Sequence, residues 1–121
     1  MNAKEEFIKH IGEIGGLGAG GRSVLCARIT FNEGGDSFDN DLTTGWDKED
    51  WSLFLKSIDR VYDNGYGGQE LFGRIWYSDG TWSEREEYDG SEWWQHYYWP
   101  SIPVELDRKD KVREQKLNQL L

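Results

Sequence analysis

The chain has 121 residues, enough for one domain with a modest hydrophobic core. Apolar residues are only 36 % of the chain, but aromatic residues are 15 %, so large rings can supply much of the buried area. The formal net charge of −9 repels phosphate backbones, which argues against direct nucleic-acid binding and favours a basic partner. Acidity that serves only solubility is the alternative interpretation.

Other classes are excluded by what the sequence lacks. Cys26 is the single cysteine, so neither an internal disulfide nor a cysteine-rich metal site is expected. No stretch approaches the ~20 apolar residues of a membrane helix, and no secretory signal is visible at the N-terminus. The sequence therefore predicts a cytoplasmic protein with no membrane contact, no cofactor and no metal.

The charge is unevenly distributed along a single predicted domain, residues 1–121. Residues 1–22 are neutral overall and predict a short helix and a glycine-rich connector. Residues 23–103 hold six bases and sixteen acids, net −10, and predict the sheet and the main helix. Residues 104–121 are net +1 and predict a C-terminal helix or tail. The acidity thus belongs to the predicted folded centre.

The N-terminal helix is predicted from Asn2, which can cap it, to the glycines at positions 15 and 16. Residues 15–23 also match a G-x-G-x-x-G pattern and nearly match a phosphate-binding loop. Both motifs need a strand before the glycines and a helix after them. Here a helix precedes them and a strand follows, so this stretch is interpreted as a connector.

Residues 23–31 alternate in polarity and predict a strand, with Leu25, Ala27, Ile29 and Phe31 on its apolar face. Residues 32–45 predict an exposed, mobile polar loop that carries four carboxylates available to a partner: Glu33, Asp36, Asp39 and Asp41. Calcium binding is the alternative for this loop, but the spacing of an EF-hand is absent.

The main helix is predicted over residues 47–64. Asp47 caps it, and Asp50 stands at the third helical position. Trp46 and Trp51 are spaced as a hydrophobic staple across this start. This helix is expected to cover one face of the sheet, and the first and last helices part of the other.

Residues 71–99 predict a three-stranded meander with two Asp-Gly turns, at 79–80 and 89–90. Two-residue loops would pair Tyr77 with Trp82, and Trp82 with Tyr97. This register places one cluster on a common face: Glu84, Glu86, Trp93 and Tyr97. It also places Ile75 opposite Glu84 and Trp76 opposite Ser83.

This cluster supports two interpretations. Carboxylates two residues apart on a strand are ~6.6–6.8 Å apart at the backbone, which permits the two-carboxylate chemistry of glycosidases. Tryptophan and tyrosine are also the residues that anchor protein interfaces. His96 and Cys26 have no partners in sequence that indicate catalysis, so no catalytic or metal-binding residue is predicted.

Three segments resemble small acidic proteins of phages and prophages: residues 77–82, residues 87–94 and Pro100-Ser101-Ile102-Pro103. The resemblance covers the C-terminal half of the chain. It implies no enzyme and no assigned site, so no catalytic residue is carried over. It implies instead a protein that acts in the host cytoplasm by binding a host protein, in some cases by imitating the charge of DNA.

The sequence as a whole predicts an α+β fold, with a mainly antiparallel four-stranded sheet packed against helices. The strand at 23–31 is expected at an edge or beside the strand at 71–77. The predicted function is non-enzymatic binding of a basic, nucleic-acid-handling protein, and the alternative is a carbohydrate-binding module or glycoside-active enzyme. The predicted partner-binding residues are Glu33, Asp36, Asp39, Asp41, Glu84, Glu86, Trp93 and Tyr97.

Overall fold

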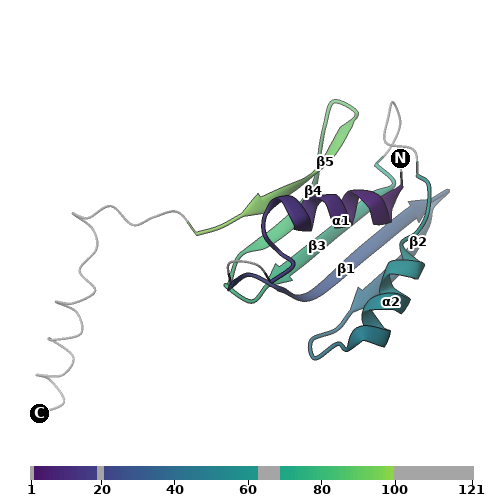
Figure 1. Ribbon diagram of the computed structural model, residues 1–121. Coiled ribbons are helices and arrows are strands. Elements are labelled where there is room, and N and C mark those ends of the chain that lie inside the picture. The colour runs from purple at the N-terminus through teal and green to yellow at the C-terminus, as the bar shows by residue number, and fades with distance from the viewer. Residues whose placement is uncertain (1, 19–20, 63–68, 100–121) are drawn as a thin grey trace, which may run out of the picture.

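A computed structural model describes residues 2–18, 21–62 and 69–99. These residues form α1 (Ala3–Glu13), β1 (Val24–Glu33), β2 (Asp36–Leu42), α2 (Lys48–Ser57), β3 (Leu71–Tyr77), β4 (Trp82–Tyr88) and β5 (Ser91–Tyr97). The strands build one antiparallel sheet in the order β2-β1-β3-β4-β5 (Figure 1). The α+β class is confirmed, with five strands rather than four, and β1 lies beside β3 rather than at an edge.

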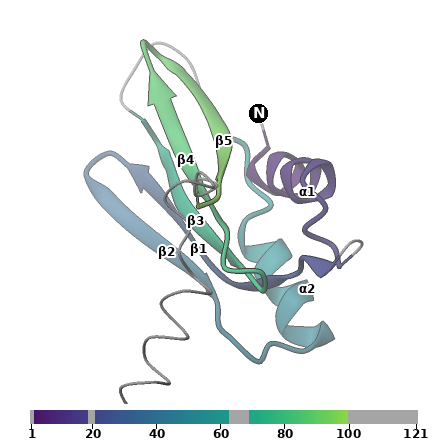
Figure 2. The same ribbon diagram turned by 90° about the vertical axis from the view of Figure 1, so that its left-hand side faces the viewer.

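Both helices lie on the same face of the sheet (Figure 2). Phe7 of α1 contacts two rings of α2, with its centroid 5.9 Å from that of Trp51 and 5.5 Å from that of Phe54. These rings join the buried apolar residues of β1 and β3 in one core. The expectation that α1 covers the opposite face is therefore wrong, and the predicted C-terminal helix lies outside the described residues.

Strand β2 occupies a segment that the sequence predicts as a loop. Gly34 and Gly35 have φ of +58° and +93°, which suits the tight turn that joins β1 to β2. Leu42 is the one residue of β2 that is buried, and aspartate has a low strand propensity, so the usual strand signal is weak. The carboxylates of this segment therefore stand on a regular edge strand, and the prediction of a mobile loop is wrong.

A β-bulge at the start of β1 changes which side chains enter the core. The pairing with β3 shifts between Val24 and Cys26, so Leu25 is the extra residue. Val24 is consequently buried and Leu25 is 44 % exposed, the reverse of the predicted alternation. From Ala27 onward the predicted apolar face is correct, because the bulge does not affect the later pairs.

The second turn of the meander is the predicted one. Asp89 and Gly90 have φ of +52° and +86°, as a two-residue type I′ turn requires. Trp82 therefore pairs with Tyr97, as the sequence indicates.

The first turn differs from the prediction by one residue. The backbone N–H of Tyr77 donates to the carbonyl of Thr81, so residues 78–80 form a three-residue loop. Only Gly80 has a positive φ, of +84°, which is the arrangement of a turn followed by a glycine bulge. Trp76 consequently pairs with Trp82, and the predicted pair of Tyr77 with Trp82 is wrong.

This shift moves every side chain of β3 to the other face relative to β4. Ile75 pairs with Ser83 under the helices, and Arg74 pairs with Glu84 on the opposite face. The predicted pairs of Ile75 with Glu84 and of Trp76 with Ser83 are therefore wrong.

Helix α2 begins as predicted and ends earlier. Asp47 and Asp50 form a reciprocal capping box, and the rings of Trp46 and Trp51 stack with centroids 5.0 Å apart. The helix ends at Ser57, seven residues before the predicted end, and the last two predicted positions lie outside the described residues.

Candidate functional site

The face of the sheet that points away from α1 and α2 is called the open face here. An aromatic row crosses it, with Trp76 on β3, Trp82 on β4 and Tyr97 on β5 in register. The rings of Trp82 and Tyr97 are nearly parallel, with an interplanar angle of 14° and centroids 5.8 Å apart. Trp99 packs edge-on against Trp82 with centroids 5.4 Å apart. The row is therefore an ordered apolar strip on an exposed surface.

A charged row runs beside it and takes one residue from each strand: Asp41, Arg28, Arg74, Glu84 and Gln95. Arg28 donates two hydrogen bonds to Asp41, of 2.7 and 2.8 Å, and these bonds lower the pKa of that carboxyl. Arg74 forms an ion pair with Glu84. The carboxylates of this row are thus held by arginines.

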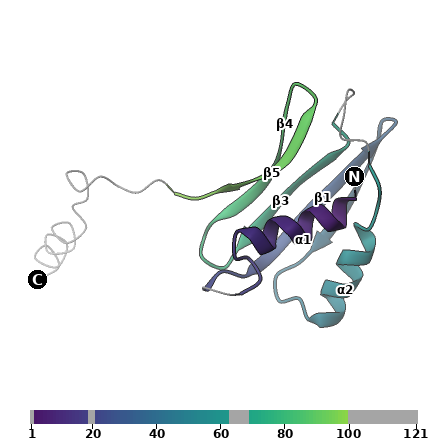
Figure 3. The same ribbon diagram turned by 45° about the horizontal axis from the view of Figure 1, so that its top comes forward.

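The four residues predicted on the meander do lie on one face. Glu86 pairs with Trp93 and lies on the same side of β4 as Glu84. The Tyr97 hydroxyl donates to Glu86, and this bond, more than burial, raises the pKa of Tyr97 to about 12. Trp93 is 39 % exposed. The hairpin of β4 and β5 continues beyond the last pair with β3 and projects from the sheet (Figure 3). Glu86 and Trp93 lie on this projecting part, whereas Glu84 and Tyr97 lie within the paired sheet.

The four predicted carboxylates of residues 33–41 are divided between two places. Asp39 and Asp41 lie on the open face beside Arg28, at 3.8 and 2.7 Å from its guanidinium nitrogen. Glu33 and Asp36 stand opposite each other in the strand register at the β1–β2 turn, on the helix-covered face. Glu33 forms an ion pair with Arg60. Six of the eight predicted residues therefore share the open face.

A buried polar network beneath the helices was missed by sequence reasoning. His10 Nε2 and Ser83 Oγ share a hydrogen bond of 2.7 Å, and Ser83 Oγ has a second one, also 2.7 Å, with the Tyr77 hydroxyl. Burial, followed by the nearby His96 and Arg85, lowers the pKa of His10 to about 4, which keeps the imidazole neutral at pH 7.

The serine at the centre of this network is closed to a substrate. Ser83 is fully buried, so a substrate has no approach to its hydroxyl. The contact between His10 and Ser83 spans 73 positions and depends on the shifted register, and the sequence holds no local signal for it.

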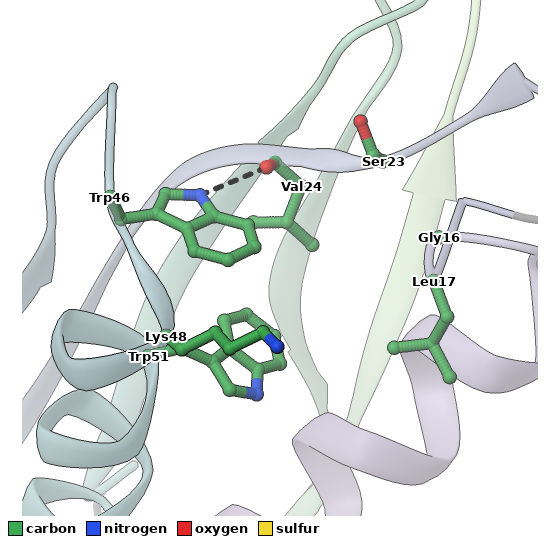
Figure 4. Close-up of a pocket in the computed structure, with 7 residues that line it drawn as sticks. All are labelled: Gly16, Leu17, Ser23, Val24, Trp46, Lys48 and Trp51. Atoms are coloured by element: carbon green, nitrogen blue, oxygen red, sulfur yellow. Dashed lines mark hydrogen bonds between the residues drawn. The ribbon is translucent and has the colours of Figure 1, made fainter.

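An apolar pocket of about 240 Å³ lies between the end of α1 and the start of α2 (Figure 4). Its lining residues are Gly16, Leu17, Ser23, Val24, Trp46, Lys48 and Trp51. Trp46 Nε1 donates to the Val24 carbonyl at 3.0 Å, which fixes the ring as one wall. The pocket offers apolar surface with one ammonium group, so its chemistry suits binding rather than proton transfer.

Other site types find no support within residues 2–18, 21–62 and 69–99. This part of the chain contains no group of three or more His, Cys, Asp or Glu residues placed to hold a metal ion. None of its helices has the length and hydropathy to cross a membrane. Cys26 is partly buried, and burial raises the pKa of its thiol.

Comparison with known proteins gave no assignment: no family model, no curated protein and no solved structure matches this chain.

Proposed function

We propose that the protein is a non-enzymatic binding module whose open face docks on a positively charged protein. The proposed partner is a nucleic-acid-handling protein of the cytoplasm that is inhibited or modulated by this contact. One observation carries the proposal: exposed rings and carboxylates share a sheet face on which no described helix lies.

The exposed rings provide anchors for such a contact. Phe72 is 40 % exposed, and Trp76 and Trp93 are each 39 % exposed, although all three belong to regular strands. Tryptophan and tyrosine are over-represented among interface residues whose replacement by alanine costs about 2 kcal/mol or more of binding free energy. We expect a loss of about this size for each ring that the partner buries. A ring buried by the partner would slow dissociation.

The net charge would act on the association rate. A chain of net charge −9 attracts a basic protein over a distance set by the salt concentration. The arginines of the charged row interrupt the carboxylates, so the open face has no continuous line of negative charge like that of a phosphate backbone. The proposal therefore rests on net charge and rings rather than on close imitation of DNA.

The test is affinity capture from the native host with the wild-type chain and matched variants, followed by surface plasmon resonance. Trp93→Ala removes an open-face ring, and Leu53→Ala is its control, because Leu53 is 57 % exposed on α2. Trp93→Ala should raise the off-rate about tenfold or more, as loss of an anchor does. Leu53→Ala should leave it unchanged.

Neutralising Asp36, Asp39 and Asp41 together should lower the on-rate and flatten its dependence on salt. Equal binding by wild type, Trp93→Ala and the neutralised chain, with all three folded, would contradict the proposal.

Carbohydrate binding is the second candidate, because the aromatic row lies beside the hydrogen-bonding groups of the charged row. A two-carboxylate enzyme is less favoured: Glu84 is bound by Arg74 and Trp82, and Glu86 by Tyr97. An NMR titration with a panel of oligosaccharides tests the sugar hypothesis. Saturable shifts of the Trp76 and Trp82 indole signals would support it, and an unchanged spectrum would remove it.

A further inference from the structure

A second cavity lies on the helix-covered side of the sheet, opposite the open face, between α1 and the strands β4 and β5. Its volume is about 230 Å³. The lining residues are Glu6, Lys9, His10 and Glu13 from α1, and Arg85, Glu92, Trp93 and Trp94 from the strands. Among the open-face residues described above, Trp93 also lines this cavity, since β5 is an edge strand of the described sheet.

The charges of this cavity favour a cation. Three carboxylates line it, against the two cations Lys9 and Arg85. Arg85 and Glu6 neutralise each other at 3.2 Å, and the same guanidinium donates to the Tyr62 hydroxyl and lies over the rings of Tyr62 and Trp94. This leaves the carboxylates of Glu13 and Glu92 against Lys9. His10 adds no positive charge at pH 7, since its pKa is about 4.

One carboxylate oxygen of the cavity has no hydrogen-bond partner. The Glu92 side chain is only 4 % exposed, and its Oε1 lies 3.9 Å from Arg85 Nε, beyond hydrogen-bond distance. The two atoms form a long ion pair, but neither has a hydrogen-bond partner among the described residues. A buried carboxylate without a donor carries a large desolvation penalty, which a cationic donor in the cavity would relieve.

The walls of the cavity add a second feature suited to organic cations. The rings of Trp93 and Trp94 both line it. The face of a tryptophan ring attracts ammonium and guanidinium groups. A bare metal ion would gain little from indole walls, because hard cations prefer several oxygen ligands.

We propose that this cavity binds an organic cation, an alkylammonium or guanidinium group, with Glu92 as its buried carboxylate and Trp93 and Trp94 as its walls. This site shares Trp93 with the open face, but its test uses small probes and no partner protein, so it stands even if the proposed protein docking fails. The cation has two sources of the same chemistry: a free amine, or a lysine or arginine side chain of another protein.

The experiment is an NMR titration of the wild-type chain with four small probes. Propylammonium and ethylguanidinium carry the charge, ethylurea is the neutral analogue of the latter, and propionate carries the opposite charge. The two cations should shift the Trp93 and Trp94 indole N–H signals saturably, with dissociation constants of about 1–10 mM. Ethylurea and propionate should leave these signals in place.

Three variants locate the site. Glu92→Gln should weaken cation binding about tenfold or more, since a charge-assisted hydrogen bond is lost. Glu13→Gln, at an exposed position of the lining, should weaken it less and is a second test if Glu92→Gln does not fold. Glu5→Gln removes one charge from an exposed position of α1 outside the lining, so it should bind as wild type does.

Acetylated, amidated Gly-Arg-Gly and Gly-Lys-Gly peptides separate the two sources. Binding of peptides and small cations alike assigns the site to a basic side chain, and binding of the small cations alone assigns it to a free amine. The proposal is overturned if ethylurea shifts the indole signals as ethylguanidinium does. It is also overturned if no probe gives saturation, or if folded Glu92→Gln and Glu13→Gln chains bind as tightly as wild type.

Discussion

At the scale of single residues, Ser83 connects the polar groups that are buried under α1. Its hydroxyl holds both His10 and Tyr77, each at 2.7 Å. Replacing Ser83 by alanine would leave His10 Nε2 and the Tyr77 hydroxyl buried without this partner. An unsatisfied buried polar atom costs more free energy than a lost hydrogen bond at an exposed site, where water replaces the partner. Ser83 thus links α1, through His10, to β3, through Tyr77.

We expect Ser83→Ala to lower the free energy of unfolding by about 1–3 kcal/mol. Urea unfolding followed by tryptophan fluorescence measures this change. Ser91→Ala, at an exposed position of β5, is the matched control and should change stability by less than about 0.5 kcal/mol. Equal losses in the two variants would show that the network contributes nothing.

His10 makes stability depend on pH. Its folded pKa of about 4 lies below the usual 6.5, so below pH 6.5 the unfolded chain binds a proton that the folded chain does not. The stabilisation is complete above pH 6.5 and is lost as the pH falls from 6.5 through 4, by about 3 kcal/mol in total.

Unfolding by urea at several pH values between 7 and 4 tests this in wild type and His10→Gln. The variant should show the smaller decrease, because glutamine does not titrate. His96, whose pKa burial also lowers, titrates in both chains and cancels in the comparison. Equal decreases in both chains would assign the pH dependence to other groups.

At the scale of elements, the first turn of the meander decides which faces the strands present. The three-residue loop depends on Gly80 at φ +84°, a conformation that other residues rarely adopt. We expect Gly80→Ala to destabilise the protein by about 1 kcal/mol, and the matched change Gly12→Ala inside α1 to stabilise it by about 0.5–1 kcal/mol. A Cβ added at position 12 or at position 80 meets nothing within 4 Å. The two variants therefore differ in backbone conformation and not in steric contacts.

Thermal unfolding of both variants measures the difference. A Gly80→Ala chain as stable as wild type would mean that the turn has an alternative conformation of similar energy.

The elements also show what the sequence could predict. Helix starts and the Asp89-Gly90 turn were predictable, because capping residues and paired positive φ values leave local signals. The first turn and the bulge at Leu25 were not, since one inserted residue reverses the faces and leaves no mark in composition.

The same holds for the candidate site. The cluster of Glu86, Trp93 and Tyr97 depends on a correctly predicted turn, and it was recognised. The aromatic row depends on the register that the first turn sets between β3 and β4. The cavity at Glu92 depends on how α1 packs against β4 and β5. Neither could be predicted from the sequence.

At the scale of the whole molecule, the net charge of −9 opposes compaction. Salt screens this repulsion between carboxylates spread over the surface, while the short contact of Arg28 with Asp41 is affected less. We expect 0.5 M sodium chloride to raise the free energy of unfolding by about 1 kcal/mol over low salt. The measurement is urea unfolding in both buffers, and a decrease with salt would show that exposed ion pairs outweigh the repulsion.

The acidic edge of the sheet has a consequence for self-association. An edge strand offers unpaired backbone groups to any other extended chain, and such contact leads to aggregation. Asp36, Asp39 and Asp41 recur along β2, so a second β2 strand approaching it would bring like charges together. Arg28 lowers the pKa of Asp41, which keeps one of these charges in place as the medium turns acid. Light scattering at pH 7 should therefore show slow fibril growth in the Asp36→Asn, Asp39→Asn, Asp41→Asn chain and none in wild type, because the carboxylates keep this strand from acting as a template.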